Sequence, residues 1–426
     1  MTDHYFYSLL SFFLFIPVVV FVRLVEKNWH SPSVIFSFLW FAVIGFSLLS
    51  APDYYFSPEA ICFVIAMVSL FFLGGWLPGK ISSPRKESAL FPNTDNVSQR
   101  RFLNFIYISL VCGFISIGFL LKDSSFSLTN ISKEKLFQIA SQFTRERYSG
   151  VRLSQLTMFF LMINYSGCMA AGYLAALGKT IRQRLFAFIV FLPLLIFTFI
   201  YTARATLLFG IILFAGTFLA AINGKEKVQR TGTNKLALLS IVLFVVFIPV
   251  IFLLTQASRM GIEKLTLNNV EYLMNYIRVW FAGNISAFSF WYDSYQAQSL
   301  GMGQFTFAGI FELLNLHTRQ LGIYSMAYDA NDRMIFTNIY TFLRFLVDDF
   351  GLLGASVFVF GLGYVSKKLS TNISGRSLIS TALLGGILSF LLFSFITSVW
   401  AYNTVLFAWM IFVFACLLIE KQYASR

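Results

Sequence analysis

Charge is scarce in this chain. Asp, Glu, Lys and Arg together make up 12% of its 426 residues, whereas soluble domains carry roughly 25%. Hydrophobic residues make up 58%, Phe alone occupies 52 positions, and the mean hydropathy is +0.74. This composition excludes an ordinary soluble domain and is typical of a protein whose helices lie in lipid.

Residues that bind metals or form disulfides are also few. The chain has three histidines and four cysteines, and the apolar surroundings of the cysteines favour buried or lipid-facing thiols over disulfides or metal ligands. The motifs of nucleotide-binding loops, dinucleotide-binding folds, zinc proteases and serine hydrolases are absent from the sequence. Acidic residues do cluster at 329–332 and 348–349, where a metal site is the lesser alternative. We therefore expect no cofactor and no metal.

Long apolar runs are what the chain has in abundance. A bilayer needs about 20 apolar residues per helix, and about eleven runs approach that length. They are Tyr5–Val22, Ser33–Ser50, Pro58–Leu77, Phe102–Leu121, Ser154–Leu177, Leu185–Tyr201, Ala205–Ala221, Leu236–Thr255, Phe350–Val365, Leu378–Ser398 and Asn403–Ile419. The sequence thus predicts an all-α polytopic membrane protein with about eleven transmembrane helices.

Basic residues in short loops predict the orientation of these helices. Most of the 32 lysines and arginines follow the odd-numbered runs, and that side should be cytoplasmic. The N-terminus then faces outward and the C-terminus inward, and Arg204 is the basic residue of the short outward loops. The first run lacks a preceding basic region and a small-residue cleavage site, so we interpret it as a retained helix.

The spans divide the chain into three parts. Residues 1–255 hold the first eight spans and an outward basic segment near 122–153, and residues 350–426 hold the last three. Residues 256–349 form a large outward segment, which is too long to be an unstructured loop. Within it, apolar residues from Leu267 to Phe281 recur every three or four positions. They predict an amphipathic helix that lies either in the membrane interface or against a protein core.

Arginines stand at the outward ends of several predicted helices. Arg145 and Arg147 precede the fifth span, and Arg204 lies in the tight turn between the sixth and seventh. A guanidinium in so short a turn stays at the membrane surface, where its planar fork can bind two phosphate oxygens. The alternative is that these side chains reach out to lipid headgroups. We favour an anionic ligand for Arg204, because contact with headgroups does not require the apex of a tight turn.

Together these features resemble the O-antigen polymerases, the repeat-unit polymerases of the Wzy type. The resemblance rests on the Phe-rich spans, the Arg204 turn, the large late outward segment, and Thr337-Asn-Ile-Tyr-Thr341 leading into Asp348-Asp-Phe-Gly-Leu-Leu-Gly354. The family often has Ser-Arg-Gly at the turn, whereas Ala205 follows the arginine here. The kinase motif with the letters Asp-Phe-Gly has partner motifs that this sequence lacks.

The resemblance implies a metal-independent membrane glycosyltransferase of the C type on the periplasmic side of the bacterial inner membrane. Its donor would be a glycan on undecaprenyl diphosphate, and its acceptor one lipid-linked repeat unit. Other expected partners are membrane lipids, a chain-length regulator and a flippase, but not nucleic acid. Fixed cations would stabilise the departing diphosphate. The candidates for this clamp are Arg204, Arg145, Arg147, Arg278, Arg319 and Arg344.

A base is also needed, because the acceptor hydroxyl loses its proton as the new bond forms. His317 comes first, since histidine titrates near neutral pH. Asp293 comes second because it follows an aromatic cluster that can stack on a sugar. Glu146 comes third, since its two flanking arginines suit it better for orienting cations. For each, the alternative is a surface residue without a catalytic role.

Two other functions remain open at this point. An O-antigen ligase has a similar architecture and the same type of donor, but transfers the glycan to a lipid A core. A flippase for the lipid-linked unit should carry cations along its spans, whereas these spans are nearly free of charge. The polymerase is therefore the preferred hypothesis.

Overall fold

The computed structural model describes most of the chain. The described residues are 2–81, 95–123, 142–146, 149, 153–178, 180–223, 250–257, 259, 266–296, 299–317, 326–330, 333–337, 339–373 and 377–424. Arg147 and Arg319, two of the predicted clamp residues, lie outside them, as does the 331–332 part of the first acidic cluster.

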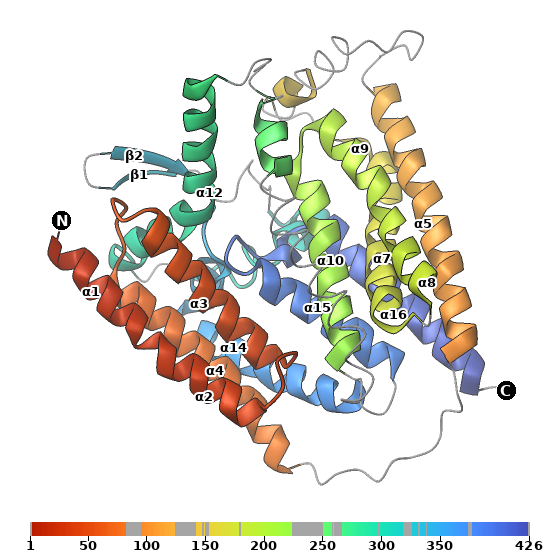
Figure 1. Cartoon of the computed structure of the whole chain (residues 1–426), viewed down its shortest axis with the longest axis horizontal. Coiled ribbons are helices and arrows are strands. Elements are labelled where there is room, and N and C mark those ends of the chain that lie inside the picture. Colours follow the sequence, from red (N-terminus) through yellow and green to blue (C-terminus); the bar gives the residue numbers. More distant parts are fainter. Residues whose placement is uncertain are drawn as a thin grey trace. The chain divides into compact units, whose positions relative to one another are not determined.

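Helices dominate the described residues (Figure 1). The first half contains α1 (Thr2–Phe13), α2 (Phe15–Glu26), α3 (Pro32–Ser50), α4 (Pro58–Ile81), α5 (Asp95–Asp123), α7 (Gln155–Leu177), α8 (Ile181–Phe186), η1 (Ala187–Val190), α9 (Phe191–Tyr201) and α10 (Arg204–Asn223). The second half contains α12 (Leu267–Asp293), α13 (Ala308–Leu313), α14 (Phe342–Ile373), α15 (Leu378–Phe393), η3 (Val399–Ala401) and α16 (Asn403–Ala424). Strands β1 (Met326–Ala330) and β2 (Arg333–Thr337) form an antiparallel hairpin.

Nine helical stretches of the described residues are long and apolar enough to cross a membrane. The first combines α1 with α2, and the sixth combines α8, η1 and α9. All nine coincide with predicted spans, so the prediction of an all-α polytopic membrane protein is confirmed. The four cysteines are free thiols, and all except Cys62 are buried.

The two remaining predicted spans differ from expectation. Most of the predicted span 236–255 lies outside the described residues. Its described part, 250–255, is helical. The other, α15, has only 16 residues because it ends at Phe393 rather than Ser398. The carbonyl of Ser394 accepts from the N–H of Phe342 at 2.8 Å, and that of Phe395 from Nδ2 of Asn284 at 2.6 Å. Partners outside the helix thus satisfy the backbone where the helix was expected to continue.

Helix α14 begins eight positions before the predicted start of the ninth span. Residues 342–349, which we assigned to the outward segment, form its first turns. Arg344, Asp348 and Asp349 interrupt the apolar pattern there, so hydropathy alone places the start too late. This extension brings charged residues of the Asp-Phe-Gly segment onto a helix.

The chain divides into two compact units. Unit 1 comprises Met1–Ser88, Arg278–Gly375 and Ile387–Asn403. Unit 2 comprises Ala89–Ile277, Arg376–Gly386 and Thr404–Arg426. The predicted large outward segment contributes to both units, because α12 passes from one to the other at residue 278. Its first turns carry the predicted apolar face, where Leu267, Val270 and Met274 are exposed.

Unit 1 is built around the pair α4 and α14. A Cβ atom on Gly363 of α14 would collide with the backbone carbonyl of Phe71 on α4, so the two backbones approach closely there. The buried rings of Trp40, Phe342 and Phe390 pack against one another in the same unit. In Figure 1, α1 and α2 follow one another along α3 and α4 within this unit.

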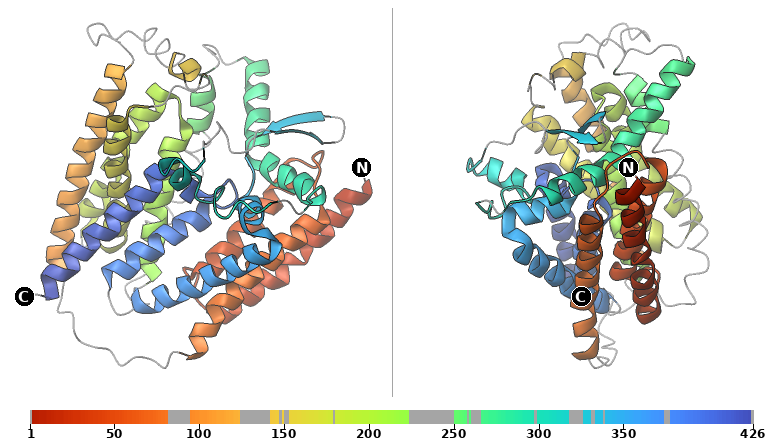
Figure 2. Two further views of the ribbon diagram at one scale, coloured as in Figure 1. Left: turned by 180° about the vertical axis from the view of Figure 1, so that it is seen from behind. Right: turned by 90° about the vertical axis from the view of Figure 1, so that its left-hand side faces the viewer.

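Unit 2 is built around α7, which packs against α5 and α10. The buried part of α7 is rich in small residues, and Asn164 on it donates from Nδ2 to the Ser109 carbonyl of α5 at 2.9 Å. Small residues and amide side chains suit contacts between helices in lipid. Lipid tails are themselves apolar, so the burial of apolar area does not by itself drive two helices together. Figure 2 shows α5, in orange, running beside α7.

Candidate functional site

Arg204 occupies the turn in unit 2 that the sequence singled out. Helix α9 ends at Tyr201, Thr202 adopts a left-handed conformation with φ 54°, and α10 begins at Arg204 itself. Although it lies next to a turn, the arginine is only 6% exposed. The charge is thus held at the end of an apolar helix rather than on a mobile, solvated side chain.

Four neighbours orient the Arg204 guanidinium. Its Nε donates to the Thr255 hydroxyl at 3.0 Å, and Nη2 donates to the Gln256 side-chain oxygen. The rings of Phe252 and Tyr276 lie 4.9 Å from the guanidinium carbon, which is within the range of cation–π attraction. Because α10 starts here, its positive macrodipole end adds to the arginine charge. The local field therefore favours an anion.

The same turn joins two further segments of unit 2. The Thr202 hydroxyl lies 2.7 Å from that of Thr144, which belongs to the short helical segment 142–146. The Thr202 carbonyl accepts from Nε of Arg259 at 2.9 Å, which satisfies the C-terminal end of α9. The structure thus places exposed Arg145 on a segment bound to the Arg204 turn. Arg259 was not among our candidates, because nothing in its sequence spacing marks it.

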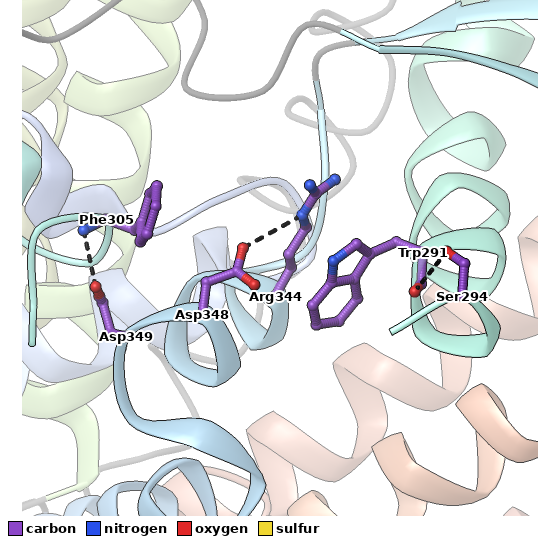
Figure 3. Close-up of polar contacts among 6 residues, drawn as sticks. All are labelled: Trp291, Ser294, Phe305, Arg344, Asp348 and Asp349. Carbon is purple, nitrogen blue, oxygen red and sulfur yellow. Dashed lines mark hydrogen bonds and ion pairs between the residues drawn. The ribbon is translucent and has the colours of Figure 1, made fainter. Parts of the chain in front are cut away.

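In unit 1, the Arg344 guanidinium contacts two aromatic rings, those of Tyr340 and Trp291, and Figure 3 shows the Trp291 ring beside it. Its guanidinium carbon is 4.1 Å from the centre of the Tyr340 ring and 5.2 Å from that of Trp291. Its Nε lies 3.5 Å from Oδ2 of Asp348, one helical turn further along α14. The side chain of Arg344 is 8% exposed and that of Asp348 is 20% exposed. Two rings and a carboxylate thus hold this second buried arginine.

Asp348 and Asp349 are adjacent but point to different partners, as Figure 3 shows. The Asp349 carboxylate accepts from the backbone N–H groups of Phe305 at 3.0 Å and Thr306 at 2.6 Å. Asp349 is fully buried, whereas Asp348 faces Arg344. One acid therefore fixes the 301–307 segment and the other contacts the arginine.

A break in α14 allows the 301–307 segment to bind at this point of the helix. Gly351 has φ 69° and ψ 176°, a conformation that is essentially restricted to glycine. The break releases carbonyl groups of the preceding turn from their helical partners. Those of Asp348 and Asp349 accept instead from the N–H groups of Gly301 at 2.9 Å and Met302 at 3.0 Å. The Asp-Phe-Gly segment is thus an anchor for 301–307.

Removing the Asp349 carboxylate should loosen that segment. In Asp349→Ala, the amides of Phe305 and Thr306 lose a charged acceptor, and an unsatisfied buried N–H costs about 1–3 kcal/mol. We expect amide hydrogen exchange of residues 301–307 to become roughly tenfold faster or more. Hydrogen-exchange mass spectrometry measures this, with Asp348→Ala as the control that leaves the anchor in place. Unchanged exchange in Asp349→Ala would show that the backbone contacts alone hold the segment.

Arg278, another predicted clamp residue, binds the end of α3. Its guanidinium pairs with Asp53, its Nε donates to the Ser50 carbonyl at 3.0 Å, and the ring of Tyr54 lies 4.8 Å away. An arginine at a helix C-terminus satisfies a terminal carbonyl and interacts favourably with the macrodipole. These contacts give Arg278 a structural role in unit 1.

Asp293, the last residue of α12, holds two hydroxyl groups. It accepts from the Tyr55 hydroxyl at 2.5 Å and from the Ser57 hydroxyl at 2.6 Å. Ser57 also lies 3.0 Å from the Glu59 carboxylate. Burial, followed by the hydrogen bond to Asp293, raises the pKa of the Tyr55 phenol above its ordinary value. Neither Tyr55 nor Ser57 was predicted, because they lie more than 230 positions from Asp293 in the chain.

The other two base candidates lie in separate places. His317 is exposed just beyond α13 in unit 1, and its backbone N–H lies 3.4 Å from the Phe311 carbonyl. Glu146 is half-buried in unit 2, and its carboxylate accepts from Nε2 of Gln142 at 2.7 Å. Among the described residues, no group of three or more His, Cys, Asp or Glu side chains is placed to hold a metal ion.

Comparisons with protein-family models, with curated proteins and with solved structures find no match to this chain.

Proposed function

We propose that this protein polymerises lipid-linked oligosaccharide repeat units at the outer face of the bacterial inner membrane. The main support is Arg204, a guanidinium held by four neighbours at the start of an apolar helix. The sequence resemblance to the repeat-unit polymerases supports the choice of substrate class. In this proposal the donor is a glycan on undecaprenyl diphosphate, and the acceptor is a single lipid-linked repeat unit.

The proposed reaction is one displacement at a sugar carbon. A hydroxyl of the acceptor attacks the anomeric carbon of the donor, and its proton passes to a base. The bond from that carbon to the diphosphate oxygen breaks, and undecaprenyl diphosphate leaves with the electron pair. Arginines stabilise the charge that develops on the leaving oxygen. Arg204 and Arg145, both of unit 2, are the proposed pair.

The test is reconstitution with a defined substrate. Purified protein in lipid nanodiscs, incubated with one synthetic undecaprenyl-diphosphate repeat unit, should produce a ladder of products that differ by one repeat. Addition of EDTA should leave the ladder unchanged, because the proposed clamp uses arginines. Product formation only when a lipid A core is supplied would replace the polymerase by the ligase. Appearance of intact substrate in the opposite leaflet, without any new product, would replace it by the flippase.

A further inference from the structure

The C-terminal end of α12 combines a carboxylate, hydroxyl groups and aromatic rings. Asp293 is exposed there, and Tyr55 and Tyr292 are half-buried beside it. The ring of His4 packs against Tyr55 with 5.9 Å between ring centres, and Tyr292 lies 5.0 Å from Phe63. Burial and the nearby charge of Asp293 both raise the pKa of the Tyr292 phenol. All these residues belong to unit 1.

The hydrogen bonds of this cluster leave acceptors in excess. Ser57 caps α4, since its oxygen accepts from the N–H of Ala60 at 3.2 Å. Its single proton faces two carboxylates, Asp293 at 2.6 Å and Glu59 at 3.0 Å, and a hydroxyl can donate to only one at a time. An ionised carboxylate has about four lone-pair sites. The two acids therefore offer more acceptor sites than Tyr55 and Ser57 can fill.

A sugar ring supplies what this cluster can bind. Neighbouring hydroxyl groups of a pyranose donate to carboxylate oxygens, and hydrogen bonds to charged acceptors are among the stronger ones. The C–H face of the ring is apolar and packs on aromatic side chains, which combine a large contact area with a polar end. We propose that Asp293 accepts hydrogen bonds from a pyranose of the acceptor repeat unit, whose ring packs on Tyr55 and Tyr292.

The place of Arg344 argues for the acceptor rather than the donor. Residues two apart in an α-helix are turned by roughly 200° from each other. Trp291, which contacts Arg344, and Asp293 therefore face nearly opposite sides of the last turn of α12. The cation that suits a diphosphate is thus on the other side of the helix from the saccharide subsite, whereas the reacting sugar of the donor is bonded directly to its diphosphate. This assignment to an acceptor rests on the proposed polymerase function, whereas saccharide binding itself does not.

Binding of a lipid-free saccharide tests the subsite separately from the chemistry. The probe is the repeat-unit oligosaccharide released by mild acid from the lipid-linked pool of the producing cells. Titration into full-length protein in nanodiscs, followed by saturation-transfer difference NMR, should give saturable binding. Asp293→Asn and Tyr55→Phe should each weaken the affinity roughly tenfold or more, because each removes part of a charge-assisted hydrogen-bond network.

Tyr272→Ala is the matched control. Tyr272 is an exposed aromatic residue on the same helix, so its loss should leave the affinity unchanged. Wild-type protein that shows no saturable binding, or Asp293→Asn protein that binds as the wild type does, overturns the subsite. Should Asp293→Asn fail to fold, Tyr55→Phe decides alone, since it keeps the ring.

The ladder assay on the same preparations separates the two proposals. A ladder from wild-type protein that binds no free saccharide would refute the subsite and leave the polymerase standing. Saccharide binding that depends on Asp293, in a protein that forms no ladder, would refute the polymerase and leave the subsite.

Discussion

Replacing Arg204 with alanine is expected to lower the polymerisation rate at least about 100-fold, because removal of one preorganised donor to a developing negative charge typically costs 10²–10³ in rate. The side chain is 6% exposed and held by Thr255, Gln256 and two rings. It therefore needs little rearrangement to meet the departing diphosphate. The measurement is the initial rate of ladder formation per mole of folded protein.

Two further variants separate charge from geometry at this position. Arg204→Lys keeps the positive charge but loses the planar fork, so we expect its rate to lie between those of alanine and wild type. Thr255→Val removes one neutral partner of the guanidinium and should lower the rate by less than Arg204→Ala does. Lys421→Ala, at an exposed position near the end of α16, is the control and should behave as wild type. Normal ladders from Arg204→Ala at a normal protein level would refute the clamp hypothesis.

Replacing Gly351 with alanine should have the largest effect on stability. At φ 69° and ψ 176°, any residue with a Cβ atom is strained by about 1–3 kcal/mol. A shift to a helical conformation would relieve that strain, but would also remove the contacts of Asp348 and Asp349 carbonyls with 301–302. We expect a fall of several degrees in the Tm of the purified protein, together with faster hydrogen exchange in 301–307.

Gly361→Ala is a matched control on the same helix. A Cβ atom there meets no other atom within 4 Å, and the position has no positive φ. Since alanine favours a helix over glycine by about 1 kcal/mol, this variant should keep or slightly raise the Tm. If Gly351→Ala were as stable as Gly361→Ala, the break in α14 would not be required by the fold.

Hydropathy predicted the spans well because lipid demands long apolar helices whatever their partners. It failed at the start of α14, where Arg344 and Asp349 are buried against neighbours that contact their charged groups. Partners offset the cost of burying a charge. A charged residue nevertheless lowers the local hydropathy by the same amount whether it is buried or exposed. The charges that mark the Asp-Phe-Gly segment were thus the reason its helical turns were missed.

The position of Arg204 followed from the sequence, but its partners did not. Thr255 and Gln256 lie more than 50 positions away, and Tyr55 is 238 positions from Asp293. Side-chain pairs of this kind depend on how helices pack, and a single sequence contains no periodic signal for them. Arg278 was also predicted as a cation of the clamp, and its contacts with the end of α3 did not follow from the sequence.

The anchor at Asp349 also has a consequence for biosynthesis. Residues 301–307 are translated before the acceptors that bind them, and Phe305 precedes Asp349 by 44 positions. At a translation rate of 5–20 residues per second, that separation corresponds to a delay of roughly 2–9 s. During this interval the segment has no access to its final acceptors. Synthesis of the first turns of α14 must therefore precede the final hydrogen bonds of the segment, and a nascent chain that stops before residue 342 cannot form them.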